Sequence, residues 1–186
     1  MTIRIATLED AAAIRAIYAP HVATLTSFEQ SVPSIEEMQR RLAATLERTP
    51  WLVLDEGEVV GYAYAGPYRS RHAYQWSVEA SVYVAAPHQR RGIARRLYAA
   101  LFAALELQGF VNVYAGITLP NDASEAFHRA LGFEPIGVYR GVGYKHGGWR
   151  DVAWSAKRLA TPDGEPSPPR LLPEARQAIA ICVAAF

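Results

Sequence analysis

The chain has 186 residues and a formal net charge of +1, with 19 Lys and Arg against 18 Asp and Glu. This length suits one domain with a sizeable core, or one domain plus a tail, and its apolar content of about half is typical of globular proteins. Nucleic-acid-binding proteins usually carry a broad excess of positive charge, so the balanced charge argues against that class.

A single cysteine, Cys182, excludes disulfide frameworks and thiolate zinc sites within the chain. It also favours a reducing compartment. The first ten residues carry early charge and no long apolar run, unlike a signal peptide. No segment offers the roughly 20 apolar residues that cross a bilayer. We therefore expect a cytoplasmic protein that does not bind membranes.

The N-terminal third predicts a strand followed by two helices. Residues 2–6 alternate as a strand does, and an apolar stripe in residues 7–18 predicts a helix that Pro20 ends. Residues 21–32 show no period, so we expect a loop, and loops often carry function. Ser34 and Glu37 form a capping-box pattern that opens a helix to about Glu47.

The central third predicts a hairpin, a strand and a long helix. Residues 51–55 and 59–66 are rich in β-formers, and the turn between them contains Gly57. After a polar, aromatic loop at 67–76, residues 77–84 alternate clearly between two faces. Apolar residues at every fourth position from Ile93 onward then predict a helix that ends at Gly109.

The last third predicts a strand at 110–117 and a short helix at 121–132 with Asp122 as its cap signal. Two β-like segments near 136–144 and 149–159 follow. The element order indicates one α/β domain over residues 1–160. Residues 161–186 read as a Pro-rich linker with a short tail. The tail either forms a helix that docks on the domain or on a partner, or it frays.

The stretch "HQRRGIARRL" places four arginines around Gly92, between the strand at 77–84 and the following helix. The first turn of a helix presents unpaired backbone N–H groups and the positive end of the helix dipole. An anion placed there meets several donors at once, which suits a pyrophosphate. The P-loop and dinucleotide-binding motifs are both absent. Taken alone, the stretch is equally consistent with a solvated helix start.

The sequence on both sides of this stretch resembles a known protein family. The pattern Q-x-x-G-x-A follows a strand and opens a helix, and the element "LPNDASEAFHRALGF" comes in the next βα unit. Together they resemble the GNAT acetyltransferases over roughly residues 2–159. The segments "VEASVYV", "HQRRGIARRLY", "LQGF", "TLPND", "ALGF" and "GYKHGGWRDVAW" are similar to the phosphinothricin acetyltransferase branch, with its methionine sulfone, methionine sulfoximine and amino-acid acetyltransferase relatives.

The resemblance implies the GNAT fold: a mixed central sheet with splayed middle strands, flanked by helices. It implies acetyl-CoA as cosubstrate. The backbone of one strand would line the pantetheine, and backbone N–H groups at the helix start would hold the pyrophosphate. Asn121 would reach the pantetheine, unless it only caps its helix. The implied cofactor-binding residues are Val82, Tyr83, Val84, Arg90, Arg91, Gly92, Ile93, Ala94, Arg95 and Asn121.

Two residues are candidates for catalysis. Acetylation of an amine requires the ammonium to lose a proton, directly or through water, and a carboxylate near the thioester suits that task. Glu79 matches the glutamate of the phosphinothricin branch. His128 stands where many GNAT enzymes have a tyrosine, and this branch shares the substitution. An imidazole there can act as acid, base or substrate ligand. Each residue also has an ordinary structural interpretation, on a strand or a helix surface.

For the acceptor, Arg69 and Arg71 alternate in the loop before the strand, and arginine pairs bind carboxylates well. Phe28 in the aperiodic loop would form a wall of the pocket. The segment "GYKHGGWRD" shapes either this pocket or a subunit contact. A homodimer is expected from the resemblance. No His/Cys cluster suggests a metal site.

The favoured hypothesis is an enzyme that transfers acetyl directly from acetyl-CoA to the α-amine of a small amino acid or analogue. A CoA-binding sensor with little turnover is the alternative, since it would keep the phosphate loop without needing Glu79. A nucleic-acid-binding domain is disfavoured by the charge balance.

Overall fold

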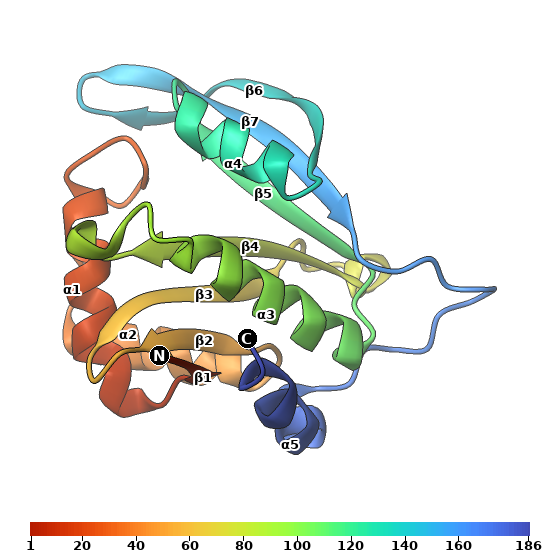
Figure 1. The fold of residues 1–186 in the computed structure, drawn as a ribbon. Helices are drawn as coiled ribbons and strands as arrows, with labels where there is room; N and C mark the ends of the chain where they lie inside the picture. The colour runs from red at the N-terminus through yellow and green to blue at the C-terminus, as the bar shows by residue number, and fades with distance from the viewer.

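The computed structural model describes all 186 residues, with the central sheet between two layers of helices (Figure 1). The sheet has seven strands in the order β1-β2-β3-β4-β5-β7-β6, and every neighbouring pair is antiparallel except β4–β5. The strands are β1 (Thr2–Ile5), β2 (Trp51–Asp55), β3 (Val59–Pro67), β4 (Ser77–Val84), β5 (Asn112–Thr118), β6 (Glu134–Lys145) and β7 (Gly148–Arg158). The helices are α1 (Ala11–Val22), α2 (Ile35–Leu46), α3 (Ile93–Gln108), α4 (Asp122–Ala130) and α5 (Leu172–Val183).

The parallel pair at the centre separates soon after it forms. Pairing of β4 with β5 covers only residues 77–79 of β4, opposite residues 112–114 of β5. Beyond Glu79, β4 remains paired with β3 as far as Val84, whereas β5 remains paired with β7. Figure 1 shows the resulting wedge between β4 and β5. The expected splayed mixed sheet is therefore present.

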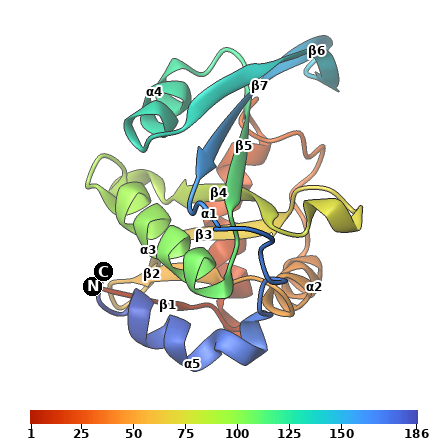
Figure 2. The ribbon, with the colours of Figure 1, turned by 90° about the vertical axis from the view of Figure 1, so that its right-hand side faces the viewer.

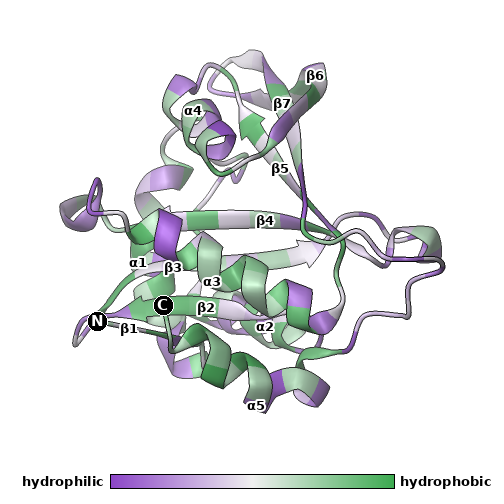
Figure 3. Cartoon of the chain, turned by 45° about the vertical axis from the view of Figure 1, so that its right-hand side comes forward, coloured by the Kyte–Doolittle hydropathy of each residue, from purple (hydrophilic) through white to green (hydrophobic).

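Helices cover the two faces of the sheet. In Figure 2, α3 and α4 lie on one side of the central strands, and α1 and α2 lie on the other. The larger apolar cluster packs α3 and α5 against the sheet, and the smaller one packs α1 and α2 against β2 and β3. Apolar residues line β2, α3 and α5 (Figure 3). Alternation on the strands and the fourfold spacing on α3 produce this burial.

Two sequence-based details are wrong. Helix α1 does not end at Pro20 but continues to Val22. A proline in the last turn of a helix removes one N–H donor, and too little helix follows it for further hydrogen bonds to be lost. The cap of α4 is Asn121 and not Asp122. Its side-chain Oδ1 accepts the N–H of Ser124 at 3.2 Å. The cap of α2 is Ser34 as expected, since its Oγ accepts the N–H of Glu37 at 3.1 Å. The Glu37 side chain pairs with Arg40 and Arg41, so the second half of the expected capping box does not form.

The C-terminal tail ends in helix α5, which docks on the domain. Leu172, Ala175, Ile179 and Val183 recur on one face of α5 and are buried in the larger apolar cluster. The helix lies against α3 and β1. Just beyond it, the carbonyl of Phe186 accepts a hydrogen bond from the Arg96 guanidinium. Of the outcomes open for this segment, the structure therefore shows a helix packed on the chain's own core.

None of the helices combines the length and the apolar character required to span a bilayer.

Candidate active site

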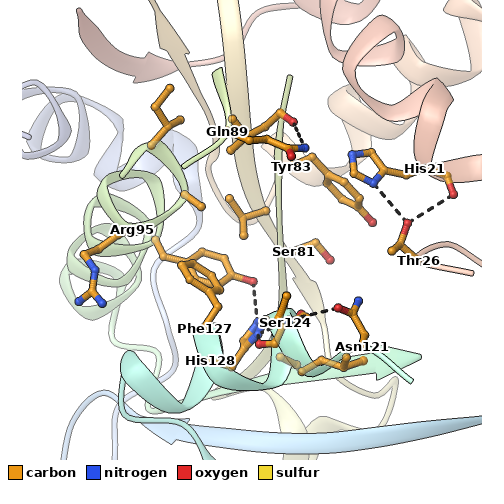
Figure 4. A pocket seen from close by; sticks show the side chains of 18 of the residues that line it. His21, Thr26, Ser81, Tyr83, Gln89, Arg95, Asn121, Ser124, Phe127 and His128 are labelled. Carbon is orange, nitrogen blue, oxygen red and sulfur yellow. Dashed lines mark hydrogen bonds between the residues drawn. The ribbon is translucent and has the colours of Figure 1, made fainter. Parts of the chain in front are cut away.

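A cavity of about 630 Å³ lies where β4 and β5 separate, between α3 and α4. Figure 4 shows residues of β4, the loop before α3 and helix α4 around it. Every residue expected at the cofactor site lines this cavity except Arg91. The residues that do so are Val82, Tyr83, Val84, Arg90, Gly92, Ile93, Ala94, Arg95 and Asn121.

The loop before α3 presents free amides to this cavity. Gly92 has a left-handed backbone with φ of +78°, and Arg90 has φ of +62°. The first bond of α3 runs from the N–H of Arg96 to the carbonyl of Gly92 at 3.1 Å, and no N–H from Arg90 to Arg95 donates to a backbone carbonyl. A cluster of free N–H groups at a helix start is an anion site. A Cβ at residue 92 would meet open space, so a side chain is not excluded by its surroundings. Glycine is required there because of the left-handed φ angle.

The four arginines of this stretch divide into two pairs. Arg91 faces the β2–β3 turn, where its guanidinium meets Glu56 at 3.3 Å and His88 Nδ1 at 2.8 Å. Arg96 is held by the C-terminal carbonyl. Arg90 and Arg95 line the cavity instead. Two side chains therefore remain to add positive charge beside the free amides.

A second cavity, of about 860 Å³, opens on the other side of the wedge. Glu79 and Phe28 line it, together with residues of the loop after α1 and of β7. Five residues line both cavities, so the two spaces meet at the wedge: Thr26, Ser81, Tyr83, Gly116 and Thr118. Two substrates bound in the two cavities would meet beside these residues.

Glu79 stands at the point where the strands separate. It is the last residue of β4 that pairs with β5, opposite Tyr114, and its side chain is half-buried. Burial raises the pKa of its carboxyl, and the positive charge of Arg69 opposes that shift. No hydrogen bond from another side chain occupies the carboxylate. A raised pKa and a free carboxylate beside a cavity are features of a general base.

His128, on α4, is buried against Tyr98 of α3, with 7% of its surface exposed. Its Nδ1 lies 2.8 Å from the carbonyl of Ser124, an acceptor, so Nδ1 carries the proton. Its Nε2 lies 3.4 Å from the hydroxyl of Tyr98. Burial lowers the pKa of His128, so the ring is neutral at neutral pH. Burial also raises the pKa of Tyr98, which keeps its hydroxyl protonated.

Asn121 lines the first cavity while it caps α4. Because its Oδ1 accepts the N–H of Ser124, its amide Nδ2 remains as the donor available to a ligand. The capping interpretation and the ligand interpretation are therefore compatible, since they use different atoms.

The two loop arginines lie outside the lining of both cavities. The Arg69 guanidinium lies 4.3 Å from the ring centre of Tyr68 and 5.8 Å from that of Trp154. Trp154 does line the second cavity, so Arg69 stands directly behind its wall. Arg71 is exposed. No Arg or Lys side chain lines the second cavity.

Sequence reasoning missed several residues that line the cavities. Ser81 follows Glu79 on the same face of β4, which its alternation could have indicated. Other members come from distant segments and carry no local signal: His21, Thr26, Tyr139, Val142 and Trp154. No cluster of three or more His, Cys, Asp or Glu side chains is placed to hold a metal ion.

A sheet opened at its centre, with an anion site at one end and a carboxylate between two joined cavities, defines a two-substrate acyltransferase architecture. The family model described as an acetyltransferase (GNAT) domain matches residues 3–154. The chain therefore belongs to the GNAT family of N-acetyltransferases.

Within this family the chain falls in the phosphinothricin acetyltransferase-like branch. It is 44% identical over 170 residues to phosphinothricin N-acetyltransferase of Streptomyces viridochromogenes, covering 90% of this chain and 91% of that one. It is 36% identical over 170 residues to L-methionine sulfoximine/L-methionine sulfone acetyltransferase of Salmonella typhimurium, covering 88% and 99% of the two chains.

A solved structure agrees in fold. The phosphinothricin acetyltransferase of Sinorhizobium meliloti in complex with acetyl-CoA superimposes with a TM-score of 0.83 at 35% identity, covering 91% of this chain and 97% of that one.

Proposed function

We propose that this enzyme transfers the acetyl group of acetyl-CoA to the α-amine of a small amino acid or analogue of the phosphinothricin, methionine sulfoximine or methionine sulfone type. One observation carries the proposal: two cavities meet at the split between β4 and β5, with free amides in one and Glu79 in the other. The acceptor class is supported by the names of its relatives.

Acetyl-CoA fits the first cavity, where it would supply the reactive thioester. The free amides from Arg90 to Arg95 would bind its pyrophosphate, and the side chains of Arg90 and Arg95 would add charge. Beyond Glu79, the edge of β4 that faces β5 has no strand partner, so the amides of a pantetheine arm can pair there. Nδ2 of Asn121 would add a donor from the start of α4.

Glu79 would act as the general base of the acetyl transfer. Its carboxylate takes a proton from the acceptor's ammonium, directly or through a water, and the freed lone pair attacks the thioester carbonyl. Desolvation brings its pKa nearer to neutrality, which improves a carboxylate as a base at physiological pH. No acyl-enzyme is needed, and the only thiol, Cys182, lies in α5.

His128 would assist the leaving thiolate. The neutral ring offers only Nε2 to a proton, and this atom faces the Tyr98 hydroxyl on the cavity wall. We assign to Nε2 the second proton that the amine nitrogen loses after its attack: Nε2 takes this proton up and passes it to the leaving thiolate, beside the Tyr98 hydroxyl that also donates to the carbonyl of Ala80. His128 is not suited to bind the acceptor's carboxylate, because its lowered pKa leaves it uncharged.

The acceptor would lie in the second cavity. Phe28 forms part of its wall, and Arg69 lies over the ring of Trp154 in that wall. Arg41 also contacts the wall, but its guanidinium is paired with Glu29 at 2.6 Å. A movement of Arg69 from its place over Tyr68 would bring a guanidinium to the acceptor's carboxylate. Arg71 would support binding from the exposed part of the same loop.

We also propose a homodimer that works in the cytoplasm. The β6–β7 hairpin exposes an unusual number of large apolar side chains, with Trp149 at 68% exposure. The others are Ile136, Val138, Tyr139, Val142 and Tyr144. A second copy is the expected cover. Light scattering tests this, with Trp149→Asp expected to shift the protein to a monomer; a monomeric wild type would contradict it.

Thiol release tests the central proposal. Purified enzyme with acetyl-CoA is assayed against phosphinothricin, methionine sulfoximine, methionine sulfone and common amino acids. Removal of a general base costs about 10²- to 10⁴-fold in rate, so Glu79→Gln should lose kcat by that factor while its Kd for acetyl-CoA stays within twofold. Glu58→Gln is the control, since that side chain is 79% exposed in the β2–β3 turn. A fully active Glu79→Gln enzyme refutes the assignment.

The same assay separates the enzyme from a CoA-binding sensor. A sensor would bind acetyl-CoA with normal affinity and release no thiol with any acceptor of the panel. Glu79→Gln would then change nothing measurable.

A further inference from the structure

Lys145, at the end of β6, has a buried side chain, with 3% of the residue exposed. Its Nζ donates to the carbonyl of Val22 and to the carbonyl of Ser27, both at 2.6 Å. Lysine is almost never fully buried unless its charge is paired or hydrogen-bonded. Lys145 lines neither large cavity, and the proposed mechanism does not use it. The residue therefore needs an explanation of its own.

The two carbonyls belong to the segment that forms the acceptor wall. Val22 is the last residue of α1, where helix carbonyls lack partners and a cation is favoured. Ser27 directly precedes Phe28. One ammonium group thus joins the end of α1 and the middle of the loop at residues 23–34 to strand β6.

Backbone pairing does not hold the middle of this loop. No residue from 25 to 33 donates or accepts a backbone–backbone hydrogen bond. All six residues from Thr26 to Ser31 nevertheless line the second cavity. The shape of that wall therefore depends on side-chain contacts.

Neighbours of Lys145 on β6 contact the same loop. The ring of Phe28 packs so closely on Gly143 that a Cβ at residue 143 would stand 2.6 Å from it. The Gln30 amide donates to the carbonyl of Tyr144 at 3.4 Å. Among the contacts from β6, only Lys145 brings a charged donor to the loop backbone; Arg15 of α1 donates to the carbonyl of Pro33, near the end of the loop, at 2.8 Å. Charge-assisted hydrogen bonds are about twice as strong as neutral ones.

We propose that Lys145 is a positioning residue of the acceptor site: its buried ammonium fixes the loop at residues 23–34, and with it Phe28, for acceptor binding. The inference rests on the proposed function, in which the second cavity holds the acceptor. It concerns mainly the acceptor, because Thr26 is the only residue of this loop that also lines the first cavity, and the free amides from Arg90 to Arg95 belong to the separate loop before α3.

The test compares Lys145→Met, which keeps the length of the side chain and removes the donors, with Lys157→Met. Lys157 is the only other lysine, and it lies over Phe102, away from the loop. For Lys145→Met we expect at least a tenfold higher KM for the acceptor, a kcat within threefold of wild type, and a Kd for acetyl-CoA within twofold. Lys157→Met should match wild type in all three values.

A second readout is independent of any acceptor. Chymotrypsin cleavage after Phe28, followed by mass spectrometry on the enzyme without ligands, reports how well the loop is held. Lys145→Met should be cut at least tenfold faster than wild type and Lys157→Met at the wild-type rate. If no acceptor on the panel reacts, the proposed function fails, while cleavage still decides whether Lys145 holds the loop.

Two further variants complete the design. Lys145→Arg keeps a cation and should give values between those of wild type and Lys145→Met; it replaces Lys145→Met should that variant not fold. Gly143→Ala displaces Phe28 while Lys145 is intact, and should also raise the acceptor KM. The proposal is overturned if the folded Lys145 variants keep the wild-type acceptor KM and cleavage rate. It is also overturned if they weaken acetyl-CoA binding as much as acceptor binding.

Discussion

Replacement of Ile179 by Ala tests whether α5 is part of the core. Ile179 is completely buried in the larger apolar cluster, whereas Ile181, two residues further along the same helix, is 71% exposed. Truncation of a buried isoleucine to alanine costs about 2–5 kcal/mol, through lost burial and the cavity left behind. The same substitution at an exposed position changes stability by about 0.5 kcal/mol or less.

For a chain of this length, each kcal/mol lowers Tm by about 2–4 °C. A loss of about 3 kcal/mol at Ile179 therefore predicts a Tm about 6–12 °C below wild type, whereas Ile181→Ala should melt within about 2 °C of it. Thermal unfolding followed by circular dichroism measures both variants without ligands. Equal melting temperatures for the two variants would refute the packing of α5 described above.

Three further outcomes are expected. Gly92→Ala should cost about 1–2 kcal/mol of stability, because its φ is left-handed, and should weaken acetyl-CoA binding. Gly57→Ala is strained in the same way at the β2–β3 turn but should leave the acetyl-CoA Kd unchanged. Calorimetry measures both binding constants. Arg95→Ala should raise the acetyl-CoA Kd several-fold and Arg91→Ala should not, because Arg91 faces Glu56; equal effects would contradict this. The acidic limb of kcat/KM should show an apparent pKa above the usual value for glutamate of about 4.3, and this limb should vanish in Glu79→Gln.

The raised pKa of Glu79 also has a consequence for stability. The folded state binds the Glu79 proton more tightly than the unfolded state does, so stability falls as pH rises from the unfolded pKa through the folded one. Glu79→Gln should therefore melt at a higher temperature than wild type at pH 7 to 8, and the gain should disappear near pH 4. A gain of the same size at both pH values would exclude ionisation of Glu79 as its cause.

Much of the fold could be predicted because its signals are local. The alternation in β4, the fourfold spacing in α3 and the Ser34 cap each depend on residues a few positions apart. Pro20 misled because a rule for helix interiors was applied to a last turn. The cap of α4 was misplaced by one residue, since Asn121 and Asp122 are both good cap residues and only the backbone decides between them.

The candidate site was partly accessible for the same reason. Most of the cofactor cavity comes from one continuous stretch around Gly92, so a short motif and its family resemblance identified it. The acceptor cavity joins the loop after α1 to β7, more than a hundred residues later. The partner of Arg91 is Glu56, and those of Lys145 are carbonyls. Such long-range pairs leave no trace in local patterns.

The short pairing between β4 and β5 implies a conflict between stability and activity. Full pairing of the two strands would add ladder hydrogen bonds and remove the edge at residues 80–84, and so would stabilise the sheet. It would also close the space in which the two cavities meet. Selection for thermal stability alone could therefore favour substitutions that extend the pairing of β4 with β5, and the resulting protein would be stable but inactive. Engineering of this enzyme therefore needs selection for activity alongside selection for melting temperature.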